Sequence, residues 1–402
     1  MKTPTARSQS SLPDLVCLSH LRWNFVFQRP QHLMSRFARE RRVFFVEEPV
    51  WGPDATHLEL QASAEHVWVA TPYIHVEGAT SVTPDAPAGR GLPREEVEAI
   101  QRMFLDQLLA EQAIHQYVLW YYTPMALGFS RHLTPQATLY DCMDELSAFA
   151  GAPPVLLERE AELYTRADRV FTGGQSLFEA KQSRHPSVHA FPSSVDVAHF
   201  KRARERLPEP DGQANIPHPR LGYFGVVDER MDLALLEGIA RLRPDWHIVM
   251  VGPVVKVDPA SLPQAPNIHW LGSRSYDQLP SYLAGWDVAL IPFACNESTR
   301  FISPTKTPEY LAAGKPVVST PIKDVIRPYG TSGLVDIAET PEAFVAAAES
   351  RLAAPRGPWL AAVDELLSTM SWDLTWSRMK AHVDACSAAP VAPPAARSEA
   401  RA

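Results

Sequence analysis

A lysine and a glutamate stand close together at a predicted helix start near residue 306. Their segment, "NESTRFISPTKTPEYLAAGKPVVST", begins polar and ends in a short apolar run that predicts a buried strand. Ser303, Thr305, Lys306 and Glu309 are its candidate ligand-binding residues. Free backbone N–H groups, the positive end of the helix dipole and the Lys306 ammonium would converge on one point, which suits a phosphate or pyrophosphate. Glu309 can accept hydrogen bonds from hydroxyls, as an acidic residue does for a ribose diol.

The start of this helix is left open by the sequence. Ser303 before Pro304 and Thr307 before Pro308 each resemble an N-cap followed by proline at the first helical position. A start at Pro304 would put Pro308 in the helix interior, whereas a start at Pro308 would leave only about six residues before Gly314. An ordinary capped helix with a solvated lysine explains the same residues when the segment is taken alone.

A second strand-to-helix turn supports the anion site. In "GYFGVVDERMD", Gly225 stands between a predicted strand and a helix, and Arg230 lies near that helix start. Such a turn lets the backbone approach a phosphate closely, and the arginine shares the charge. Both turns face the same edge of a parallel sheet, where ligands collect at the carboxyl ends of strands. Glu229 and Gly252, at the same edge, complete the candidate ligand-binding residues.

The first predicted strand is followed by side chains that suit sugar binding. His20, at the strand end, could donate to a sugar hydroxyl or handle the proton of an acceptor, although a structural histidine fits equally well. The candidate acceptor-binding residues that follow it are Arg22, Trp23, Gln28 and Arg29. For Trp23, packing within the loop is favoured over a role as a platform for a sugar.

Two aspartates follow another predicted strand. Asp141 and Asp144 could orient acceptor hydroxyls or act as a base, and Asp144 is the second candidate catalytic residue beside His20. The favoured alternative for Asp144 is a cap on the helix that follows. The spacing of the two aspartates differs from that of an Asp-x-Asp motif.

Short β-rich apolar runs alternate with segments of helical period, which predicts parallel sheets covered on both faces. In the first half, strands are predicted at 14–20, 42–48, 117–122, 137–142 and 169–174, and helices at 29–40, 95–113, 155–166 and 175–183. The same alternation returns between 220 and 320. A stretch rich in charge and proline, 201–219, is the predicted linker.

The prediction is an α/β protein of two Rossmann-like, doubly wound domains. We expect a first domain at 13–200, a second at 218–370, a C-terminal helix at 371–386 and disordered tails at 1–12 and 387–402. The composition, with 46% apolar and 21% charged residues, is that of a soluble globular protein.

The charge and cysteine pattern excludes several classes of function. A net charge of −8 argues against nucleic acid as a partner. The four cysteines are far apart without any CxxC, so neither a zinc site nor a disulfide framework is indicated. The N-terminus lacks an apolar signal core and no stretch approaches the ~20 apolar residues of a membrane span. We therefore expect a cytoplasmic protein.

A membrane surface stays open as a partner. Five arginines crowd around one predicted helix and could meet anionic lipids at the inner face of the membrane. A solvated helix end is the favoured explanation. The five are Arg29, Arg36, Arg39, Arg41 and Arg42.

Four segments together resemble the bacterial GT-B glycosyltransferases of the retaining group 1 type, glycosyltransferase family 4. They are "SPTKTPEYLAAGKPVVST", "YDCMDELSAF", "ADRVFTGGQSLFEAKQ" and "FPSSVDVAHF". The resemblance extends over about residues 13 to 385. It implies a nucleotide-diphosphate-sugar donor bound by the second domain, an acceptor bound by the first, and no metal or cofactor. It also implies that the last helix crosses back to the first domain, anchored by Trp372 and Trp376.

The resemblance also implies roles for single residues. By position, Glu309 resembles the family's ribose-contacting glutamate, Lys306 and Arg230 its pyrophosphate-neutralising cations, and Gly225 the glycine under the phosphates. Family members commonly carry another glutamate eight positions before the ribose-contacting one, but Phe301 stands there in this chain.

The implied function is a retaining, metal-independent sugar transfer that serves polysaccharide biosynthesis. The acceptor would be a glycan, a lipid-linked sugar or a small molecule. Two alternatives stay open: a nucleotide-sugar epimerase on the same scaffold, and a catalytically silent sugar-binding protein. The missing glutamate at Phe301 is the feature that keeps the second alternative open.

Overall fold

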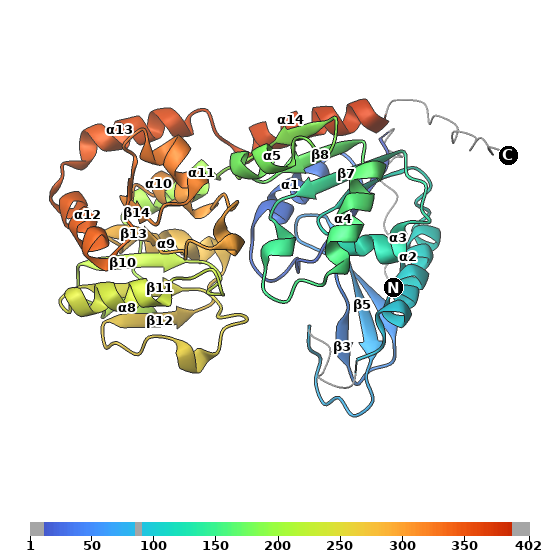
Figure 1. Cartoon of the computed structure of the whole chain (residues 1–402), viewed down its shortest axis with the longest axis horizontal. Coiled ribbons are helices and arrows are strands. Elements are labelled where there is room, and N and C mark those ends of the chain that lie inside the picture. Colours follow the sequence, from blue (N-terminus) through green and yellow to red (C-terminus); the bar gives the residue numbers. More distant parts are fainter. Residues whose placement is uncertain (1–11, 85–90, 388–402) are drawn as a thin grey trace, which may run out of the picture.

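The computed structural model describes residues 12–84 and 91–387, which form two lobes side by side, each built on a sheet with helices around it (Figure 1). The blue-to-green lobe holds the first predicted domain and the yellow-to-red lobe the second. The predicted α/β class with two parallel sheets is confirmed. The predicted tails lie outside the described residues, apart from Leu12 and Ser387.

The first sheet has nine strands in the order β3-β5-β2-β1-β6-β7-β8-β9, with β4 also paired to β5. Its strands are β1 (Asp14–Leu18), β2 (Val43–Val46), β3 (Val50–Gly52), β4 (His57–Ala62), β5 (Trp68–His75), β6 (Tyr117–Tyr121), β7 (Ala137–Cys142), β8 (Arg169–Thr172) and β9 (Val188–Ala190). All pairs are parallel except β4 with β5. Strands such as β2 are buried along their whole length because helices cover both faces.

The sequence patterns missed β3, β4, β5 and β9 of this sheet. Strand β4 is exposed or half-buried throughout and pairs antiparallel with its neighbour. It therefore lacks the continuous apolar run by which the buried parallel strands were predicted.

The second sheet has six parallel strands in the order β12-β11-β10-β13-β14-β15. They are β10 (Arg220–Phe224), β11 (His247–Val251), β12 (Ile268–Gly272), β13 (Val288–Ile291), β14 (Val317–Ser319) and β15 (Val335–Ile337). In both sheets the strand order reverses next to the first strand, at β1/β6 and at β10/β13. Ligands of doubly wound folds bind at such a reversal, outside the carboxyl ends of the strands.

The four helices predicted in the first half lie close to their predicted places. In the first lobe they are α1 (Arg29–Phe37), α2 (Arg94–Glu111), α3 (Leu127–Ser130), α4 (Val155–Arg166) and α5 (Gln175–Lys181). Two short helices, α6 (Val197–Lys201) and α7 (Asp211–Ala214), follow. The rest are α8 (Leu233–Leu242), α9 (Leu279–Ala284), α10 (Lys306–Ala312), α11 (Lys323–Val325), α12 (Pro341–Ala353), α13 (Arg356–Leu367) and α14 (Trp372–Ser387). The four predicted helices of the first half are α1, α2, α4 and α5, whereas α3, α6, α7, α11, α12 and α13 were not predicted.

The C-terminal helix crosses back to the first lobe, as predicted. Figure 1 shows the chain running from α13 on the second lobe to α14 on the first. The Trp372 ring stacks on His32 with 4.6 Å between centroids, and the Trp376 ring meets Phe37 edge-on. Met379 is fully buried in the core of the first lobe. These contacts bury the apolar face of α14 against α1.

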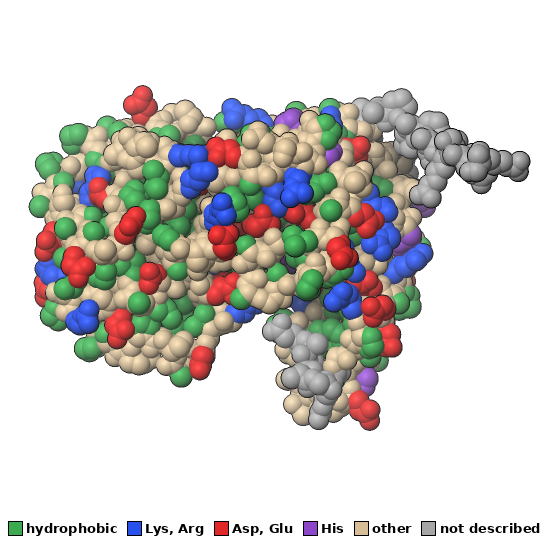
Figure 2. All heavy atoms as spheres, in the orientation of Figure 1, with side chains coloured by type: hydrophobic (Ala, Val, Ile, Leu, Met, Phe, Trp, Pro, Cys, Tyr) green, Lys and Arg blue, Asp and Glu red, His purple; other side chains and the backbone are tan. Residues whose placement is uncertain are grey.

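The five arginines near α1 are all engaged in ion pairs. Arg29 pairs with Asp141, Arg36 and Arg39 with Asp373, Arg41 with Asp384, and Arg42 with Asp14. Each of the five arginines thus has a carboxylate partner, and Asp373 is shared by two of them. Figure 2 likewise shows acidic and basic side chains interspersed over the visible face. Among the described residues, no helix is both long and apolar enough to cross a membrane.

The predicted linker packs against the second lobe. Within it, Gln213 is fully buried, donates to the carbonyl of Tyr282 and accepts from the indole N–H of Trp286. Ala203 and Ile216 join the apolar core of that lobe. The domain limits themselves stay a prediction.

Candidate active site

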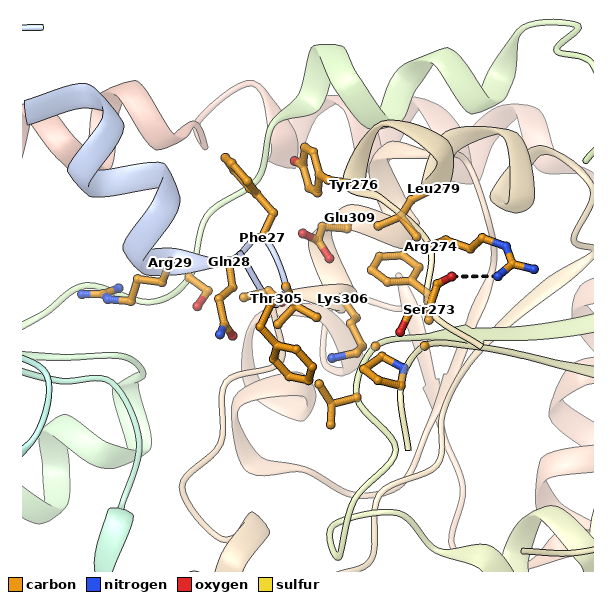
Figure 3. A pocket seen from close by; sticks show the side chains of 18 of the residues that line it. Phe27, Gln28, Arg29, Ser273, Arg274, Tyr276, Leu279, Thr305, Lys306 and Glu309 are labelled. Atoms are coloured by element: carbon orange, nitrogen blue, oxygen red, sulfur yellow. Dashed lines mark hydrogen bonds between the residues drawn. The ribbon is translucent and has the colours of Figure 1, made fainter. Parts of the chain in front are cut away.

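A cavity of about 620 Å³ lies between the two lobes, and we call it the first cavity. Its second-lobe wall follows four strand ends, at Gly225, Gly252, Ser273 and Phe293. The opposite wall comes from residues 23–29 and Asp144 of the first lobe. Figure 3 shows Lys306 and Glu309 directed into this cavity, across from Phe27 and Gln28. Ser303 and Thr305 also line it.

The helix that carries Lys306 begins at neither proline. Helix α10 starts at Lys306, with Thr305 at the N-cap position and no side-chain capping bond. Pro308 is its third residue, where a backbone N–H would have no partner within the helix, so the proline removes no hydrogen bond. Gly314, with a φ of +71°, follows the helix end in the left-handed region, as a glycine there commonly does.

Lys306 crosses directly over Gly225. The glycine has a φ of +134°, which side chains other than hydrogen rarely allow, and a Cβ there would collide with the Lys306 side chain. The Lys306 ammonium lies 5.4 Å from the ring centre of Tyr223 and 5.7 Å from that of Phe293. The glycine therefore gives the lysine its path to the strand ends, in agreement with the predicted pairing of these two residues.

Arg230 lines the same cavity and is fixed on two sides. Its guanidinium forms a bidentate pair with Asp228, at 3.0 Å and 2.6 Å. It also lies 5.4 Å from the ring centre of Phe149, which belongs to the first lobe. The two cations predicted to share one hollow do share it.

Burial shifts the pKa values of two side chains of helix α10, Lys306 and Glu309. It lowers the pKa of Lys306 to about 8, assisted by the nearby Arg230. It raises the pKa of Glu309 to about 8, while the Lys306 ammonium opposes that shift. Both groups thus change protonation within a range in which an exposed lysine stays charged and an exposed glutamate stays ionised.

These shifts predict how anion binding depends on pH. As the pH rises through 8, Lys306 loses its positive charge and Glu309 gains a negative one, so both changes repel a phosphate. We expect the affinity for a nucleoside diphosphate to fall by at least ~10-fold between pH 7 and pH 9.5, with net proton uptake on binding. Calorimetry in two buffers of different ionisation enthalpy measures both. An affinity that is constant over this range would contradict the perturbed pair.

Asp144 faces the cavity from the first lobe. The 3-10 turn that follows, Leu146–Ala148, has Glu145 at its N-cap, so the capping role favoured from sequence is wrong. Burial raises the pKa of Asp144, and Arg230 and Arg29 oppose the shift.

A buried charge cluster holds the Asp144 loop in place. The Lys181 ammonium, at the end of α5, pairs with Glu145 at 2.8 Å and with Glu160 at 3.0 Å. Tyr140 donates to Glu160 at 2.9 Å. The residue next to Asp144 is thereby tied to the two helices beneath it, which limits how far Asp144 can move.

His20 lies outside the first cavity. It lines a neighbouring cavity of about 680 Å³, called the second cavity below. Burial lowers the pKa of His20 to about 4, so the ring is neutral at physiological pH. Its Nδ1 atom is buried and has no hydrogen-bond partner among the described residues.

Three predicted binding residues have partners within the fold. Arg22 pairs with Glu47, donates to the carbonyl of Pro49 and lines neither cavity. Arg29 belongs to the wall of the first cavity, but it is 1% exposed and pairs with Asp141, and its guanidinium points away from the cavity in Figure 3. Glu229 accepts from the N–H of Ala150 at 2.9 Å and lines the second cavity, not the first.

Trp23 and Gln28 keep their places at the site. Trp23 is 5% exposed and packs edge-on against Phe45, which agrees with the favoured packing role. Gln28 lines both cavities.

Contacts between the lobes were missed by the sequence reasoning. Tyr276, which follows β12, packs on Phe27 with 4.7 Å between ring centres, and both line the first cavity. Asp324 accepts from the N–H of Ser176 at 3.0 Å. Tyr276 could have been predicted from its position after a strand end. The pairing of Ser176 with Asp324 leaves no local signal, because these residues are 148 positions apart in the sequence.

Phe301 also joins the lobes. Its side chain packs against the apolar cluster of the first lobe that includes Tyr140 and Leu177, and it lies outside the lining of the first cavity. The position that carries a glutamate in the family thus serves an apolar contact here. Within the described ranges, no group of three His, Cys, Asp or Glu side chains is gathered as a metal site.

Much of the second lobe is similar to a known protein family. Residues 218–354 match the family model described as "Glycosyl transferases group 1". The "Putative teichuronic acid biosynthesis glycosyltransferase TuaH" of Bacillus subtilis (strain 168) is 26% identical over 218 residues. This similarity covers 50% of the present chain and 55% of that protein, so the chain spans about half the length of this relative.

Solved structures resemble the whole chain. Sucrose-phosphate synthase from Thermosynechococcus elongatus has a TM-score of 0.68 and 14% identity, covering 93% of this chain and 99% of that one. Anabaena HepE, solved in complex with UDP and glucose, has a TM-score of 0.61 and 12% identity, covering 92% and 99%. The chain therefore has the two-lobed GT-B fold of these glycosyltransferases, and residues 218–354 of its second lobe match the family model of group 1 glycosyltransferases.

Proposed function

We propose that this protein is a retaining, metal-independent glycosyltransferase that moves a sugar from a nucleoside-diphosphate sugar to a hydroxyl group of an acceptor. The observation that carries the proposal is the gathering of Lys306, Arg230 and Glu309 around Gly225 in one cavity between the lobes. The family match over this lobe, and the UDP and glucose held by Anabaena HepE, support a nucleotide-sugar donor.

Each donor contact follows from the chemistry of the cavity wall. The diphosphate lies against Lys306 and Arg230, with the Gly225 turn beneath it, because fixed cations and close backbone suit a dianion. Glu309 accepts hydrogen bonds from the ribose hydroxyls. Gly252, Ser303 and Thr305 complete the donor wall.

During the transfer, negative charge develops on the departing diphosphate, next to the Lys306 and Arg230 side chains. The acceptor oxygen forms a bond to the anomeric carbon while the bond from that carbon to the diphosphate oxygen breaks. The acceptor proton passes to the departing phosphate, and attack on the leaving-group face retains the configuration. Lys306 and Arg230 stabilise the negative charge that develops on the diphosphate. Asp144, across the cavity, orients the acceptor hydroxyl.

The acceptor enters from the first lobe, where His20 and Asp144 both line the second cavity. We infer that the reaction takes place in the cytoplasm and serves polysaccharide biosynthesis, with a glycan, lipid-linked or small-molecule acceptor. The name of the relative TuaH, which refers to teichuronic acid biosynthesis, supports that pathway class.

A thermal-shift screen tests the proposal. The full chain is heated with UDP, ADP, GDP and their sugar conjugates, and at least one should raise the melting temperature, since ligand at 100 times its Kd stabilises by ~2.7 kcal/mol. Glu309→Ala should remove most of that shift. If no nucleoside diphosphate shifts the transition, the donor site is wrong. Conversion of a nucleotide sugar without acceptor would instead identify an epimerase.

A further inference from the structure

Asp228 stands two residues before Arg230 in the turn that follows β10. Backbone hydrogen bonds hold this turn in place. The N–H of Ala294 donates to the carbonyl of Arg230 at 2.8 Å, and the N–H of Met231 donates to the turn itself, at the Asp228 carbonyl, at 3.0 Å. The Asp228 carboxylate also accepts from the N–H of Arg230 at 3.0 Å. The second lobe thus sets where the Arg230 backbone lies, and side-chain contacts set where its guanidinium points.

The Asp228 carboxylate occupies one edge of that guanidinium. Its Oδ1 accepts from Nε of Arg230 at 3.0 Å and its Oδ2 accepts from Nη2 at 2.6 Å, and these two nitrogens share an edge of the planar group. Of the five N–H groups of a guanidinium, three remain, two on Nη1 and one on Nη2. Among the described residues, Nη1 of Arg230 makes no hydrogen bond. An edge with two parallel N–H groups suits a phosphate, which can accept both.

Phe149 of the first lobe holds the same guanidinium from another side. The Cζ atom of Arg230 lies over the Phe149 ring, 5.4 Å from its centre. The neighbouring residues, Glu229 and Ala150, are joined by a hydrogen bond of 2.9 Å between the lobes. A guanidinium that lies over a ring and is bonded along one edge has little freedom to turn. Arg230 is therefore oriented by contacts from both lobes.

Asp228 itself lies away from the donor side. Arg230 lines both cavities, whereas Asp228 lines only the second. The carboxylate therefore reaches a diphosphate in the first cavity only through the arginine. A carboxylate in direct contact with the diphosphate would repel it, so this separation is needed for a supporting role.

We propose that Asp228 is a positioning residue for sugar transfer, which turns the guanidinium of Arg230 so that its Nη1–Nη2 edge faces the diphosphate of the donor. This inference rests on the proposed function, which places the diphosphate at Arg230. A fixed direction of the N–H groups matters most while charge develops on the leaving group, because preorganised donors need no rearrangement at that moment. Asp228 therefore contributes to the rate of transfer more than to the affinity for the nucleotide.

Asp228→Asn tests this role in the full chain. The amide oxygen can still accept from the N–H of Arg230, so the turn is kept, but the amide N–H groups now face a side chain that offers only donors. The substrate is the UDP, ADP or GDP sugar that gives the largest thermal shift, with water as acceptor. We expect kcat for release of the nucleoside diphosphate to fall by about 10- to 100-fold, the loss that a misplaced group causes.

The affinity for the nucleoside diphosphate should change by less than ~3-fold, as measured by calorimetry. The loss of a fixed fork and the loss of a nearby negative charge act on it in opposite directions. Asp228→Ser, whose hydroxyl can accept the same N–H, should show the same fall in kcat. A loss of nucleotide affinity with unchanged kcat would overturn the inference, as would unchanged kcat and affinity.

Asp245 provides a matched control on the same lobe. It pairs with Arg243, two positions away, through Nε at 2.9 Å and Nη2 at 2.7 Å, and the Arg243 guanidinium lies 4.0 Å from the ring centre of Trp246. This arrangement repeats the carboxylate, arginine and ring of the site, but Arg243 and Asp245 line neither the first nor the second cavity. Asp245→Asn should leave kcat and nucleotide affinity unchanged. An equal fall in kcat there would contradict a role specific to Asp228.

A double substitution shows whether Asp228 acts through Arg230. Arg230→Lys keeps the positive charge but lacks the planar fork, so there is no edge left to orient. In that background, Asp228→Asn should lower kcat by no more than ~2-fold, because two residues that act as a unit are not additive. A full further fall would mean that Asp228 acts on its own, and would overturn the positioning role.

Nuclear magnetic resonance of the free protein separates this inference from the proposed function. A guanidinium bonded along one edge turns slowly and gives separate Nη signals, and Arg230→Lys identifies those of Arg230 by their loss. We expect separate signals in the unmodified protein and averaged signals in Asp228→Asn. Separate signals in both, or averaged signals in both, would overturn this inference and leave the donor site standing. Absent binding of every nucleoside diphosphate would instead overturn the donor site, while the difference between the signals is still measured.

Discussion

Lys306→Met should lower kcat by about 100- to 1000-fold, the loss typical when one fixed donor to a developing negative charge is removed. The ammonium lies over the rings of Tyr223 and Phe293 at the wall of the first cavity. Methionine keeps most of the apolar length of the side chain, so the walls of the cavity stay filled. Steady-state kinetics and nucleotide titration measure the two effects separately.

The same substitution should not lower the stability of the free protein. Burial lowers the pKa of Lys306 to about 8, below its unfolded value, so the folded state disfavours the ammonium at every pH below about 10. Removing the charge removes that penalty, and Glu309, whose pKa is already raised, can take up a proton. A melting temperature well below that of the unmodified protein would contradict this account, because it would make Lys306 structural.

Lys315 supplies a matched control. It is also a buried lysine of the second lobe whose pKa burial lowers to about 8, but its ammonium donates to the carbonyls of Ala284 and Trp286. Lys315→Met should destabilise by about 1–3 kcal/mol, because two buried acceptors lose their donor. Its nucleotide affinity should not change, since Lys315 lies outside the first cavity. The two lysines thus separate a binding role from a folding role.

The donor side of this site is predictable from sequence because its signals are local. Gly225 directly follows β10, and Lys306 and Glu309 lie on the helix that follows β13; parallel strands bring such strand-to-helix connections to one edge of the sheet. The doubly wound fold follows from the same alternation of strands and helices. The sequence signals that bring these residues together thus lie within short segments of the chain.

Contacts between residues that are far apart in the sequence leave no such local signal. Glu229 meets Ala150, and Arg29 meets Asp141, only because the lobes and sheets are assembled. The binding residues of the first lobe were therefore harder to predict. Arg22 and Arg29 have side chains that suit sugar binding, but each forms an ion pair with a buried carboxylate. The start of α10 could not be predicted either, because two candidate N-caps, each followed by a proline, competed and the helix uses neither.

Arg29→Met should destabilise the protein by about 3–5 kcal/mol, the usual effect of removing one partner from a buried ion pair. The guanidinium donates to both oxygens of Asp141, at 3.0 Å and 2.8 Å, and to the carbonyl of Phe191 at 2.6 Å. The exposed fractions of the two side chains are 1% and 0%, so the carboxylate left behind could not reach water. Urea unfolding followed by circular dichroism measures the change.

Arg39→Met is the control for the loss of an arginine near α1. Arg39 pairs with Asp373, but both side chains are 59% exposed, so its removal should change stability by no more than ~1 kcal/mol. Replacing both buried partners, in Arg29→Met with Asp141→Leu, should restore much of the stability, because no uncompensated charge remains. If Arg29→Met instead kept full stability and raised only the KM for the acceptor, Arg29 would be a binding residue after all. The buried pair predicts the opposite: a loss of folding free energy that a second, apolar substitution repairs.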